Sequence, residues 1–456
     1  MTPNCEQIIA QQREFFQTGQ PRNLNFRKSQ LQKLRAVIVE NKSKILEGLN
    51  QDLHKCEQEG YYELNPISEI DYTLKHLDKW AKIKRTFTSP VMWPSIGEIH
   101  PEPLGVVLII SPWNYPFSLA ISPLVGAIAA GNCAVIKPSE ISPKTSQVLA
   151  EVIGKNFDPN YIAVVEGDAE VSQALLAQKF DHIFFTGSTR IGKIVMEAAA
   201  KHLTPVTLEL GGKSPCIVDE DCDISCTARR IVWGKFLNAG QICIAPDYVL
   251  VNQKVKAELT EAMLAEIQSF YGENPEESSD YARIINEKQF NSLEKLLQEG
   301  KILCGGKTNP ETRYIAPTLI EDVTWDSLVM QEEIFGPILP ILEYNRLEEA
   351  IAKINERPKP LALYLFSQDS QIQRQVLEQV SSGTAVLNDT ILQVSVHQLP
   401  FGGVGQSGMG SYHGLASFQT FSHYKSVLRR WFWLDLNLRY PPYGDKLQLF
   451  KKLLGY

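Results

Sequence analysis

The sequence predicts an α/β fold made of two doubly wound domains. Short apolar runs, such as residues 106–110 and 133–137, alternate with segments whose apolar residues recur at helical spacing. The same alternation of strand-like and helix-like segments begins again after Pro215, which indicates a second unit of the same kind. With 456 residues, of which 44% are hydrophobic and 21% charged, the chain is long enough for substantial cores. Ligands of such folds bind beyond the carboxyl ends of the parallel strands.

Composition excludes several classes of function. The 45 basic residues and 52 acidic residues leave a net charge of −7, which does not suit a nucleic-acid-binding protein. The eight cysteines show no paired metal-binding spacing, so we expect cytosolic thiols and no metal site. The N-terminus lacks a basic region followed by an apolar run, and no stretch reaches the roughly 20 apolar residues of a membrane-spanning helix. We therefore expect a cytoplasmic protein.

The N-terminal part of the sequence predicts helices that pack on the protein body, followed by a segment that leaves this body. Over residues 6–55, apolar side chains such as Leu31, Leu34 and Ile38 recur three or four residues apart among many charges. Residues 85–103 are instead rich in Thr, Pro, Trp and Gly, with short β-like pieces. We expect this second stretch to leave the main body of the protein.

The first predicted domain places polar or glycine residues at its strand ends. Asn114 follows the first strand, Lys137 and Glu140 follow the second, and Gly187 follows the fourth. In a parallel sheet such residues lie at one edge, where ligands bind. The predicted strands are residues 106–110, 133–137, 162–165, 182–186 and 206–210, and the predicted helices are residues 117–130, a helix ending at Gly154, and residues 189–200.

The second predicted domain follows Pro215. Glu209 ends the last strand of the first domain, and Cys243 lies inside the second, so a site in the cleft between the domains is expected. The predicted strands of this domain are residues 216–218, 248–251, 338–342, 361–366 and 384–387.

Cys243 lies in a segment, residues 236–246, that is bounded by Gly and Pro and sets one thiol between two isoleucines. A thiol is a strong nucleophile at neutral pH only as thiolate, so a function for Cys243 requires a base, dipoles and an oxyanion site nearby. The alternative is a small buried hydrophobe before a strand. The segment alone favours neither interpretation.

Glu209 stands at the end of a predicted strand. Val206, Leu208 and Leu210 face one way along this strand, Glu209 faces the other, and a Gly-Gly turn follows. A carboxylate in a partly dry cleft has a raised pKa, which suits a general base near neutrality. The alternative is a strand-end carboxylate that pairs with a lysine such as Lys213.

Two weaker motifs suit a nucleotide. Residues 187–192 follow a strand and open a helix, which offers unpaired N–H groups and a positive dipole end to a pyrophosphate. The alternative is a glycine turn capped by Ser188 or Thr189. Lys137 and Glu140 can both hydrogen-bond the adenosine ribose hydroxyls, and the alternative there is a solvent-facing ion pair.

Together with Pro-Trp-Asn at residues 112–114 and Glu-Ile-Phe-Gly-Pro at residues 333–337, the motifs around Glu209 and Cys243 resemble those of the aldehyde dehydrogenase superfamily, in the same order. The resemblance runs from residue 20 to residue 425. The stretches most similar to the class 3 branch, which includes fatty and aromatic aldehyde dehydrogenases, are residues 184–215 and 400–423.

The resemblance implies a covalent oxidation of aldehydes to acids. The Cys243 thiolate attacks the carbonyl, the thiohemiacetal gives a hydride to nicotinamide, and water hydrolyses the remaining thioester. Glu209 is implied as the general base that activates this water. The Asn114 side chain and the Cys243 backbone N–H are implied as oxyanion donors. From the residues alone, the alternative for Asn114 is a turn position, because its neighbours are turn formers.

The resemblance also implies NAD or NADP as cofactor and a tunnel for the aldehyde. Glu140 would repel a 2′-phosphate, which modestly favours NAD. The glycine-rich stretch 400–410 is implied to line the substrate entrance and the arm, and the His413 that follows it has no implied catalytic role. The implied cofactor-binding residues are Lys137, Glu140, Gly187, Ser188, Gly192, Glu333 and Phe335. The implied tunnel residues are Trp113, Tyr115 and His413.

The same resemblance implies a division of the chain. Residues 1–84 and 104–208 are expected to form a Rossmann-like cofactor-binding domain, and residues 209–392 a catalytic domain. Residues 85–103 and 393–425 are expected to form a β oligomerisation arm. Because class 3 enzymes are dimers, a homodimer is implied.

Residues 426–456 are expected to form a tail with a short amphipathic helix, because Leu447, Phe450, Leu453 and Leu454 fall on one side of it. The Arg-Tyr-Pro-Pro-Tyr run before this helix resembles fatty aldehyde dehydrogenases. We expect the helix to dock on the protein's own body near the tunnel mouth, with peripheral contact to a membrane as the alternative. Either arrangement favours long or bulky apolar aldehydes.

Two other functions stay open. In the first, coenzyme A attacks the thioester, and the enzyme becomes an acyl-transferring reductase. Glu209 argues against this, because an activated water would compete with the thiol. In the second, the chain is a catalytically silent scaffold, which predicts a missing member of the constellation, whereas every member is present.

Overall fold

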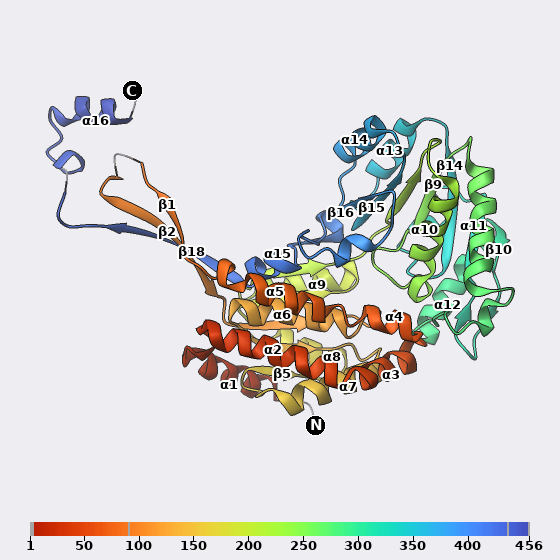
Figure 1. Ribbon diagram of the computed structural model, residues 1–456, viewed down its shortest axis with the longest axis horizontal. Helices are drawn as coiled ribbons and strands as arrows, with labels where there is room; N and C mark the ends of the chain where they lie inside the picture. The colour runs from red at the N-terminus through yellow and green to blue at the C-terminus, as the bar shows by residue number, and fades with distance from the viewer. Residues whose placement is uncertain (1–3, 90–91, 436, 455–456) are drawn as a thin grey trace.

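The computed structural model describes residues 4–89, 92–435 and 437–454. Figure 1 shows two α/β units and a β arm that runs out from one of them. The units contain a six-stranded and a seven-stranded sheet, and the arm contains a three-stranded sheet. The predicted α/β fold with two doubly wound sheets is therefore confirmed.

The N-terminal residues form separate helices rather than one continuous run. Gly19 has φ 77°, and a short 3-10 turn with buried Pro21, η1 (Gln20–Arg22), follows it. The Asn23 side chain then caps the next helix by accepting two backbone N–H bonds. The helices are α1 (Cys5–Gln17), α2 (Leu24–Glu40), α3 (Lys42–Leu53), α4 (Glu57–Tyr62) and α5 (Pro66–Trp80).

The six-stranded sheet has the order β17-β7-β6-β3-β4-β5, and β3 to β7 are parallel. The register pairs Ile110 with Lys137 and with Phe185, so these strands end level with one another. Residues that leave these strand ends therefore share one edge of the sheet. The strands are β3 (Val106–Ile110), β4 (Cys133–Lys137), β5 (Ile162–Val164), β6 (His182–Thr186) and β7 (Val206–Glu209), and the helices are α6 (Ser118–Ala130), α7 (Pro143–Asn156), α8 (Ala169–Leu176) and α9 (Thr189–Ala200).

A short strand from the glycine-rich stretch completes this sheet. β17 (Gly408–Met409) runs antiparallel to β7, with Gly408 opposite Glu209. Gly408 has φ 139°, and a Cβ there would collide with the carbonyl oxygen of Leu208, so the close approach requires glycine. The expected placement of residues 393–425 in the arm is therefore wrong for β17, because β17 lies beside β7, the strand that carries Glu209.

The seven-stranded sheet has the order β10-β13-β14-β9-β8-β15-β16 and is parallel except for β10 at its edge. All five predicted strands are present, and β10 and β13 lie outside the predictions. The strands are β8 (Pro215–Val218), β9 (Tyr248–Asn252), β10 (Lys301–Cys304), β13 (Thr318–Glu321), β14 (Ile338–Tyr344), β15 (Ala362–Phe366) and β16 (Thr384–Leu387), with a separate hairpin of β11 (Thr308–Asn309) and β12 (Tyr314–Ile315). The helices are α10 (Ile224–Phe236), α11 (Lys256–Tyr271), α12 (Glu287–Leu296), α13 (Leu347–Asn355) and α14 (Ser370–Gln379).

The arm is an antiparallel sheet of β1 (Lys84–Phe87), β2 (Ser95–Pro103) and β18 (Ser422–Arg430), with β2 in the middle. The predicted boundary between arm and tail, at residue 426, falls inside β18 and is wrong, because β18 pairs with β2 as far as Arg430. α15 (Gly414–Thr420), which precedes β18 in the chain, packs against α5 and α6. The rest of the domain division stays a prediction.

The C-terminal helix lies far from the two α/β units. α16 (Lys446–Leu454) forms where the tail predicts a helix, after the short turn η8 (Asn437–Arg439). Figure 1 shows α16 at the far end of the arm, and Leu447 and Leu449 are exposed. The expected docking of this helix on its own body is therefore wrong, because β18 carries the chain outward before the helix begins.

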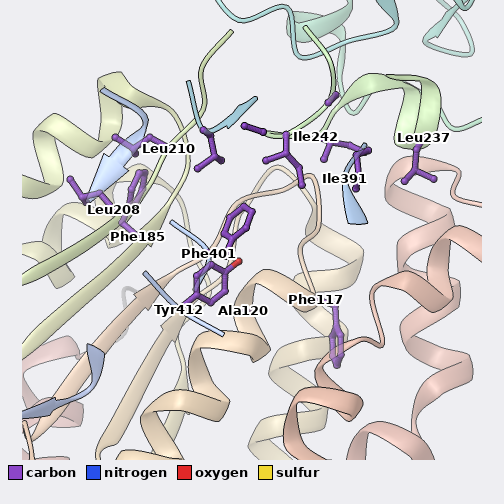
Figure 2. Packing of buried hydrophobic residues seen from close by; sticks show 14 of the residues in the cluster. Phe117, Ala120, Phe185, Leu208, Leu210, Leu237, Ile242, Ile391, Phe401 and Tyr412 are labelled. Carbon is purple, nitrogen blue, oxygen red and sulfur yellow. The ribbon is translucent and has the colours of Figure 1, made fainter. Parts of the chain in front are cut away.

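Buried apolar residues of both units meet in one contiguous cluster. Figure 2 shows Leu208 and Leu210 of the first unit, Ile242 of the second, and Phe401 and Tyr412 from the stretch that contains β17. All five are buried. This packing joins three separate parts of the sequence near Glu209 and Cys243.

Candidate active site

The backbone before Cys243 turns through three left-handed residues. Asn238, Ala239 and Gly240 have φ of 51°, 49° and 75°. For a residue with a Cβ, such as Ala239, this conformation costs roughly 1–2 kcal/mol, so tertiary contacts must hold it. A Cβ at Gly240 would collide with the carbonyl oxygen of Gly336, so this position requires glycine. The turn brings Cys243, which is half-buried, to the junction of the two units.

The surroundings of Cys243 keep its thiol protonated at rest. Burial raises the pKa of the Cys243 thiol, and the charges of Glu333 and Glu209 raise it further. The backbone N–H groups of Cys243 and Ile244 act in the opposite direction. Because the thiolate is the nucleophile, reaction requires a base that takes the thiol proton.

Glu209 is buried at the end of β7, and it does not pair with Lys213. The Lys213 ammonium instead pairs with Asp247 and donates to the carbonyl oxygens of Val329 and Glu332, at 2.9 Å each. Neither carboxylate oxygen of Glu209 has a hydrogen-bond partner within the described parts of the chain. Burial raises the pKa of Glu209 well above the ordinary range of a carboxyl group. The ion-pair interpretation of Glu209 is therefore wrong.

Asn114 lies directly against the loop that carries Cys243. Its side-chain Nδ2 donates to the carbonyl oxygen of Gln241 at 3.0 Å. Its own carbonyl oxygen accepts bonds from Lys55 Nζ at 2.9 Å and from Asn238 Nδ2 at 3.1 Å. Asn114 therefore has more than a local turn role, because it joins the first unit to the turn before the thiol.

The first turn of α9 opens at the same sheet edge. Gly187 leaves β6 with its N–H bonded to the carbonyl oxygen of Glu209 at 3.0 Å. Ser188 is exposed, and its Oγ accepts one backbone N–H of the first helical turn at 3.4 Å, which is the predicted cap. A Cβ at Gly192 would collide with the Leu210 side chain, so glycine lets α9 lie close to this segment. The remaining N–H groups of the turn can face an anion.

Lys137 and Glu140 lie together where β4 ends. Lys137 Nζ donates to the carbonyl oxygen of Pro138 at 2.7 Å and lies 3.4 Å from a Glu140 carboxylate oxygen. The Lys137 side chain is buried, and burial lowers the pKa of its ammonium group, whereas 45% of the Glu140 side chain is exposed. The pair is therefore solvent-facing only on its glutamate side.

Glu333 and Phe335 reach the site from the loop before β14. The Glu333 carboxylate accepts the Gly212 N–H and lies so close to Gly211 that a Cβ there would collide with it. Burial raises the pKa of Glu333 to about 8. Phe335 has φ 50°, and its ring meets the Trp113 ring edge to face at 5.2 Å. The structure thus brings one predicted cofactor residue, Phe335, into contact with a predicted tunnel residue, Trp113.

The other two predicted tunnel residues have buried charged neighbours. The Tyr115 ring centroid lies 3.7 Å from Lys55 Nζ. His413 is buried, with its Nδ1 3.1 Å from a Glu69 carboxylate oxygen and its ring stacked on Tyr412 at 4.0 Å. Their position in a substrate tunnel stays a prediction.

Tyr412 is a site residue that the sequence analysis misses. Its ring is buried and packs edge to face on Phe401. Burial raises the pKa of the Tyr412 hydroxyl, and the charges of Glu209 and Cys243 add to this effect. The signal in the sequence is that Tyr412 lies two residues after the end of the glycine-rich stretch.

The part of the chain that the structure describes offers neither a metal cluster nor a membrane-spanning helix. No group of three or more His, Cys, Asp or Glu side chains there could hold a metal ion. Among the helices there, none is long and apolar enough to cross a bilayer.

A thiol, a buried carboxylate with free oxygens and an amide donor meet where two parallel sheets join, beside an open helix N-terminus. This arrangement suits a nucleotide-dependent dehydrogenase that works through a cysteine. The sequence pattern of the aldehyde dehydrogenase family matches residues 2–427. The chain belongs to this family and is an NAD(P)-dependent aldehyde dehydrogenase, as the resemblance predicts.

Similar proteins come from animals and bacteria. The chain is 48% identical to the dimeric NADP-preferring aldehyde dehydrogenase of Canis lupus familiaris, over 96% of this chain and 97% of that protein. It is 48% identical to the 4,4'-diaponeurosporen-aldehyde dehydrogenase of Staphylococcus aureus, over 98% of each chain. It is also 48% identical to aldehyde dehydrogenase family 3 member A2 of Rattus norvegicus, over 96% of this chain and 92% of that protein.

Solved structures agree with the fold. The substrate-bound Staphylococcus aureus AldH superposes with a TM-score of 0.97 at 47% identity, over 98% of this chain and 99% of that chain. The NAD-dependent aldehyde dehydrogenase of Sinorhizobium meliloti superposes with a TM-score of 0.86 at 28% identity, over 95% of this chain and 88% of that chain.

Proposed function

We propose that this enzyme oxidises aldehydes to free carboxylic acids through a thioester on Cys243, which a water activated by Glu209 hydrolyses. The observation that carries this proposal is the state of Glu209. It is buried, its oxygens are free of partners within the described residues, and its charge acts on the Cys243 thiol. An ionised carboxylate with free oxygens can accept a proton from a water beside the thioester.

The residues divide the reaction into two halves. Glu209 takes the thiol proton, and the Cys243 thiolate bonds to the carbonyl carbon, whose π electrons move onto oxygen. Asn114 Nδ2 and the Cys243 N–H stabilise this oxyanion. When bound, a nicotinamide ring supplies the hydride acceptor for the oxidation. Glu209 then releases this proton to solvent and is again a carboxylate. In the second half, Glu209 takes a proton from water, the water oxygen bonds to the thioester carbon, and the C–S bond breaks to return the thiolate and release the acid.

The residues present fit a dinucleotide cofactor. The first turn of α9 offers N–H groups beside the exposed Ser188, as a pyrophosphate requires. Lys137 and Glu140 form a donor and acceptor pair that suits ribose hydroxyls. Glu333 would hold the second ribose, and Phe335 would pack near the nicotinamide. Both NAD and NADP are accepted in this proposal, because the exposed Glu140 side chain can turn away from a 2′-phosphate.

Product analysis tests the proposal against acyl transfer to coenzyme A. A panel of short, long and aromatic aldehydes is oxidised with NAD or NADP, with and without coenzyme A. We expect one free acid for each reduced cofactor, at a rate that coenzyme A leaves unchanged, because Glu209 supplies water to the thioester. Formation of acyl-coenzyme A, or a rate that depends on coenzyme A, contradicts the proposal. A chain that oxidises no member of the panel supports the silent-scaffold alternative.

We also propose that the enzyme is a homodimer that acts on long or bulky apolar aldehydes. The relative from Canis lupus familiaris is named dimeric, and the Staphylococcus aureus relative is named for the 4,4'-diaponeurosporen aldehyde. The arm leaves large apolar side chains exposed, which favours a partner surface there. These exposed residues include Phe87, Met92, Trp93, Leu428, Trp431, Phe432 and Trp433.

The tail contributes to substrate selection in this proposal, either on the partner subunit or at a membrane surface. Truncation after Tyr443 removes α16, whose exposed Leu447 and Leu449 offer apolar contact. We expect kcat/KM to fall more for long-chain than for short-chain aldehydes, since each buried methylene contributes about 0.8 kcal/mol. Loss of binding to anionic vesicles in a sedimentation assay would assign the helix to a membrane. Equal losses at every chain length, with unchanged vesicle binding, would show that the tail only stabilises the fold.

A further inference from the structure

A buried group of charges, Lys55, Glu59 and Glu63, lies behind the proposed oxyanion site. The Lys55 and Glu63 side chains are 0% exposed, with Nζ and Oε1 2.6 Å apart. Glu59 is 6% exposed. Burial of charge is costly, and a buried ion pair adds little stability compared with apolar residues of the same volume. Stability alone therefore does not explain these buried charges, and their role is sought in their contacts with the active site.

Lys55 holds the backbone of Asn114. Its Nζ donates to the Asn114 carbonyl oxygen at 2.9 Å, pairs with Glu63, and lies against the face of the Tyr115 ring. These contacts occupy the ammonium group on three sides. Lys55 thus binds Asn114 through its main chain, whereas the Asn114 side chain contacts the loop that carries Cys243.

Glu63 holds the same segment at its other end. Its second carboxylate oxygen accepts the Ser118 N–H, at the start of α6, at 2.9 Å. Phe117, which precedes this helix, provides no side-chain cap. Glu63 therefore caps α6, and a negative charge is favourable at a helix N-terminus. Through Lys55 and Glu63, the segment from Asn114 to Ser118 is fixed at both ends.

Glu59 holds the strained turn before Cys243. Its carboxylate oxygens accept the Asn238 N–H at 3.2 and 3.1 Å. The Asn238 side chain then donates to the carbonyl oxygens of Asn114 and Gln241, at 3.1 and 3.2 Å. Asn114 Nδ2 donates to the same Gln241 oxygen. The two backbone segments that would stabilise the oxyanion are thus tied to each other and to Glu59.

We propose that Lys55, Glu59 and Glu63 are positioning residues for the oxyanion-binding pair, which set the distance between the Asn114 amide and the Cys243 N–H. Lys55 touches the backbone of Asn114, Glu59 that of Asn238 and Glu63 that of Ser118, and in this proposal none of the three touches the substrate. The proposal rests on the proposed oxyanion role of Asn114. It explains why these side chains are buried here: each one fixes a backbone group, either in the segment from Asn114 to Ser118 or in the turn through Asn238.

Lys55→Met tests this proposal in the full-length enzyme, with Arg27→Met as the matched control. Arg27 is also a buried cation, and it donates to the carbonyl oxygens of Pro21, Arg22 and Ala129, at the far end of α6. Both variants are expected to lower the melting temperature. Only Lys55→Met is expected to lower kcat and kcat/KM together, by about 10- to 100-fold, as a displaced catalytic group does. The Kd for NAD should change in neither variant.

A double-mutant cycle separates positioning from general damage. If Lys55 acts through Asn114, then Lys55→Met should cost less than about threefold in kcat when Asn114 is already alanine. Full additivity of the two losses overturns the positioning role, as does a loss of kcat in Arg27→Met equal to that in Lys55→Met. If Asn114→Ala by itself leaves kcat unchanged, the proposed oxyanion role fails, which is a separate result.

Glu59 provides a second test if Lys55→Met does not fold. Glu59→Gln keeps one carbonyl oxygen that can accept the Asn238 N–H, whereas Glu59→Leu keeps the volume and removes the acceptor. We expect Glu59→Gln to retain kcat within about threefold and Glu59→Leu to lose about 10-fold or more. Equal activity in the two variants overturns the role of Glu59.

Discussion

Cys243→Ser is expected to abolish aldehyde oxidation while leaving NAD binding measurable. A hydroxyl has a far higher pKa than a thiol, and the buried site already raises the pKa of the Cys243 thiol, so serine cannot form the covalent adduct. We expect kcat to fall by at least about 10⁴-fold, the scale seen when a covalent nucleophile is removed. Steady-state NADH formation measures kcat, and fluorescence titration measures the Kd for NAD.

Cys304→Ser is the matched control, because Cys304 is another half-buried thiol of the second unit whose pKa is raised by burial. This variant should keep wild-type kcat. Near wild-type turnover in Cys243→Ser would refute the assignment of Cys243 as nucleophile. Loss of NAD binding in the same variant would show that the substitution disturbs the fold.

Glu209→Gln is expected to slow thioester hydrolysis by roughly 10²- to 10⁴-fold, the range for removal of a general base. Glutamine keeps the size and polarity of the side chain but cannot take a proton from water. Because Glu209 also takes the thiol proton, NADH formation in the first turnover should slow as well, but less than hydrolysis does. Rapid mixing should therefore show a slowed burst of NADH, as the thioester accumulates, followed by still slower turnover. The exposed neighbour Glu332 provides the control, and Glu332→Gln should behave as wild type.

The pH dependence of hydrolysis gives an independent measure of Glu209. A base acts in its deprotonated form, and burial raises the pKa of Glu209 above that of an ordinary carboxyl group. The hydrolysis rate should therefore increase with pH at values well above about 4.3, the usual glutamate pKa, and this increase should vanish in Glu209→Gln. If the variant slows neither thiol activation nor hydrolysis in single-turnover measurements, the role of Glu209 as base is wrong.

Local pattern predicted most of the strands and singled out the candidate site residues. Short apolar runs predict β3, β4 and β6 within the observed bounds, because a buried parallel strand needs apolar side chains on both faces. Cys243 and Glu209 could be singled out because each stands in a distinctive motif. Their order along the chain predicts a site in the cleft between the two units.

Partners distant in sequence could not be predicted in the same way. The sequence admitted a pair of Glu209 with Lys213, and only the folded chain shows that Lys213 is engaged by Asp247. Tyr412 and Lys55 stand in no recognisable motif, and each reaches the site through contacts with residues far along the chain. Hydrophobic periodicity reports which face of an element is buried, not what lies opposite it.

The sequence by itself determined the α/β class, the two sheets and the family, and it singled out the proposed nucleophile, because these depend on local periodicity and on contiguous motifs. Only the tertiary structure decided that Gly408 pairs with Glu209 and that α16 lies out at the end of the arm. It alone joined Lys55 and Glu59 to the oxyanion site. Each of these facts depends on the path of the chain between distant segments, and many backbone paths satisfy the same local pattern.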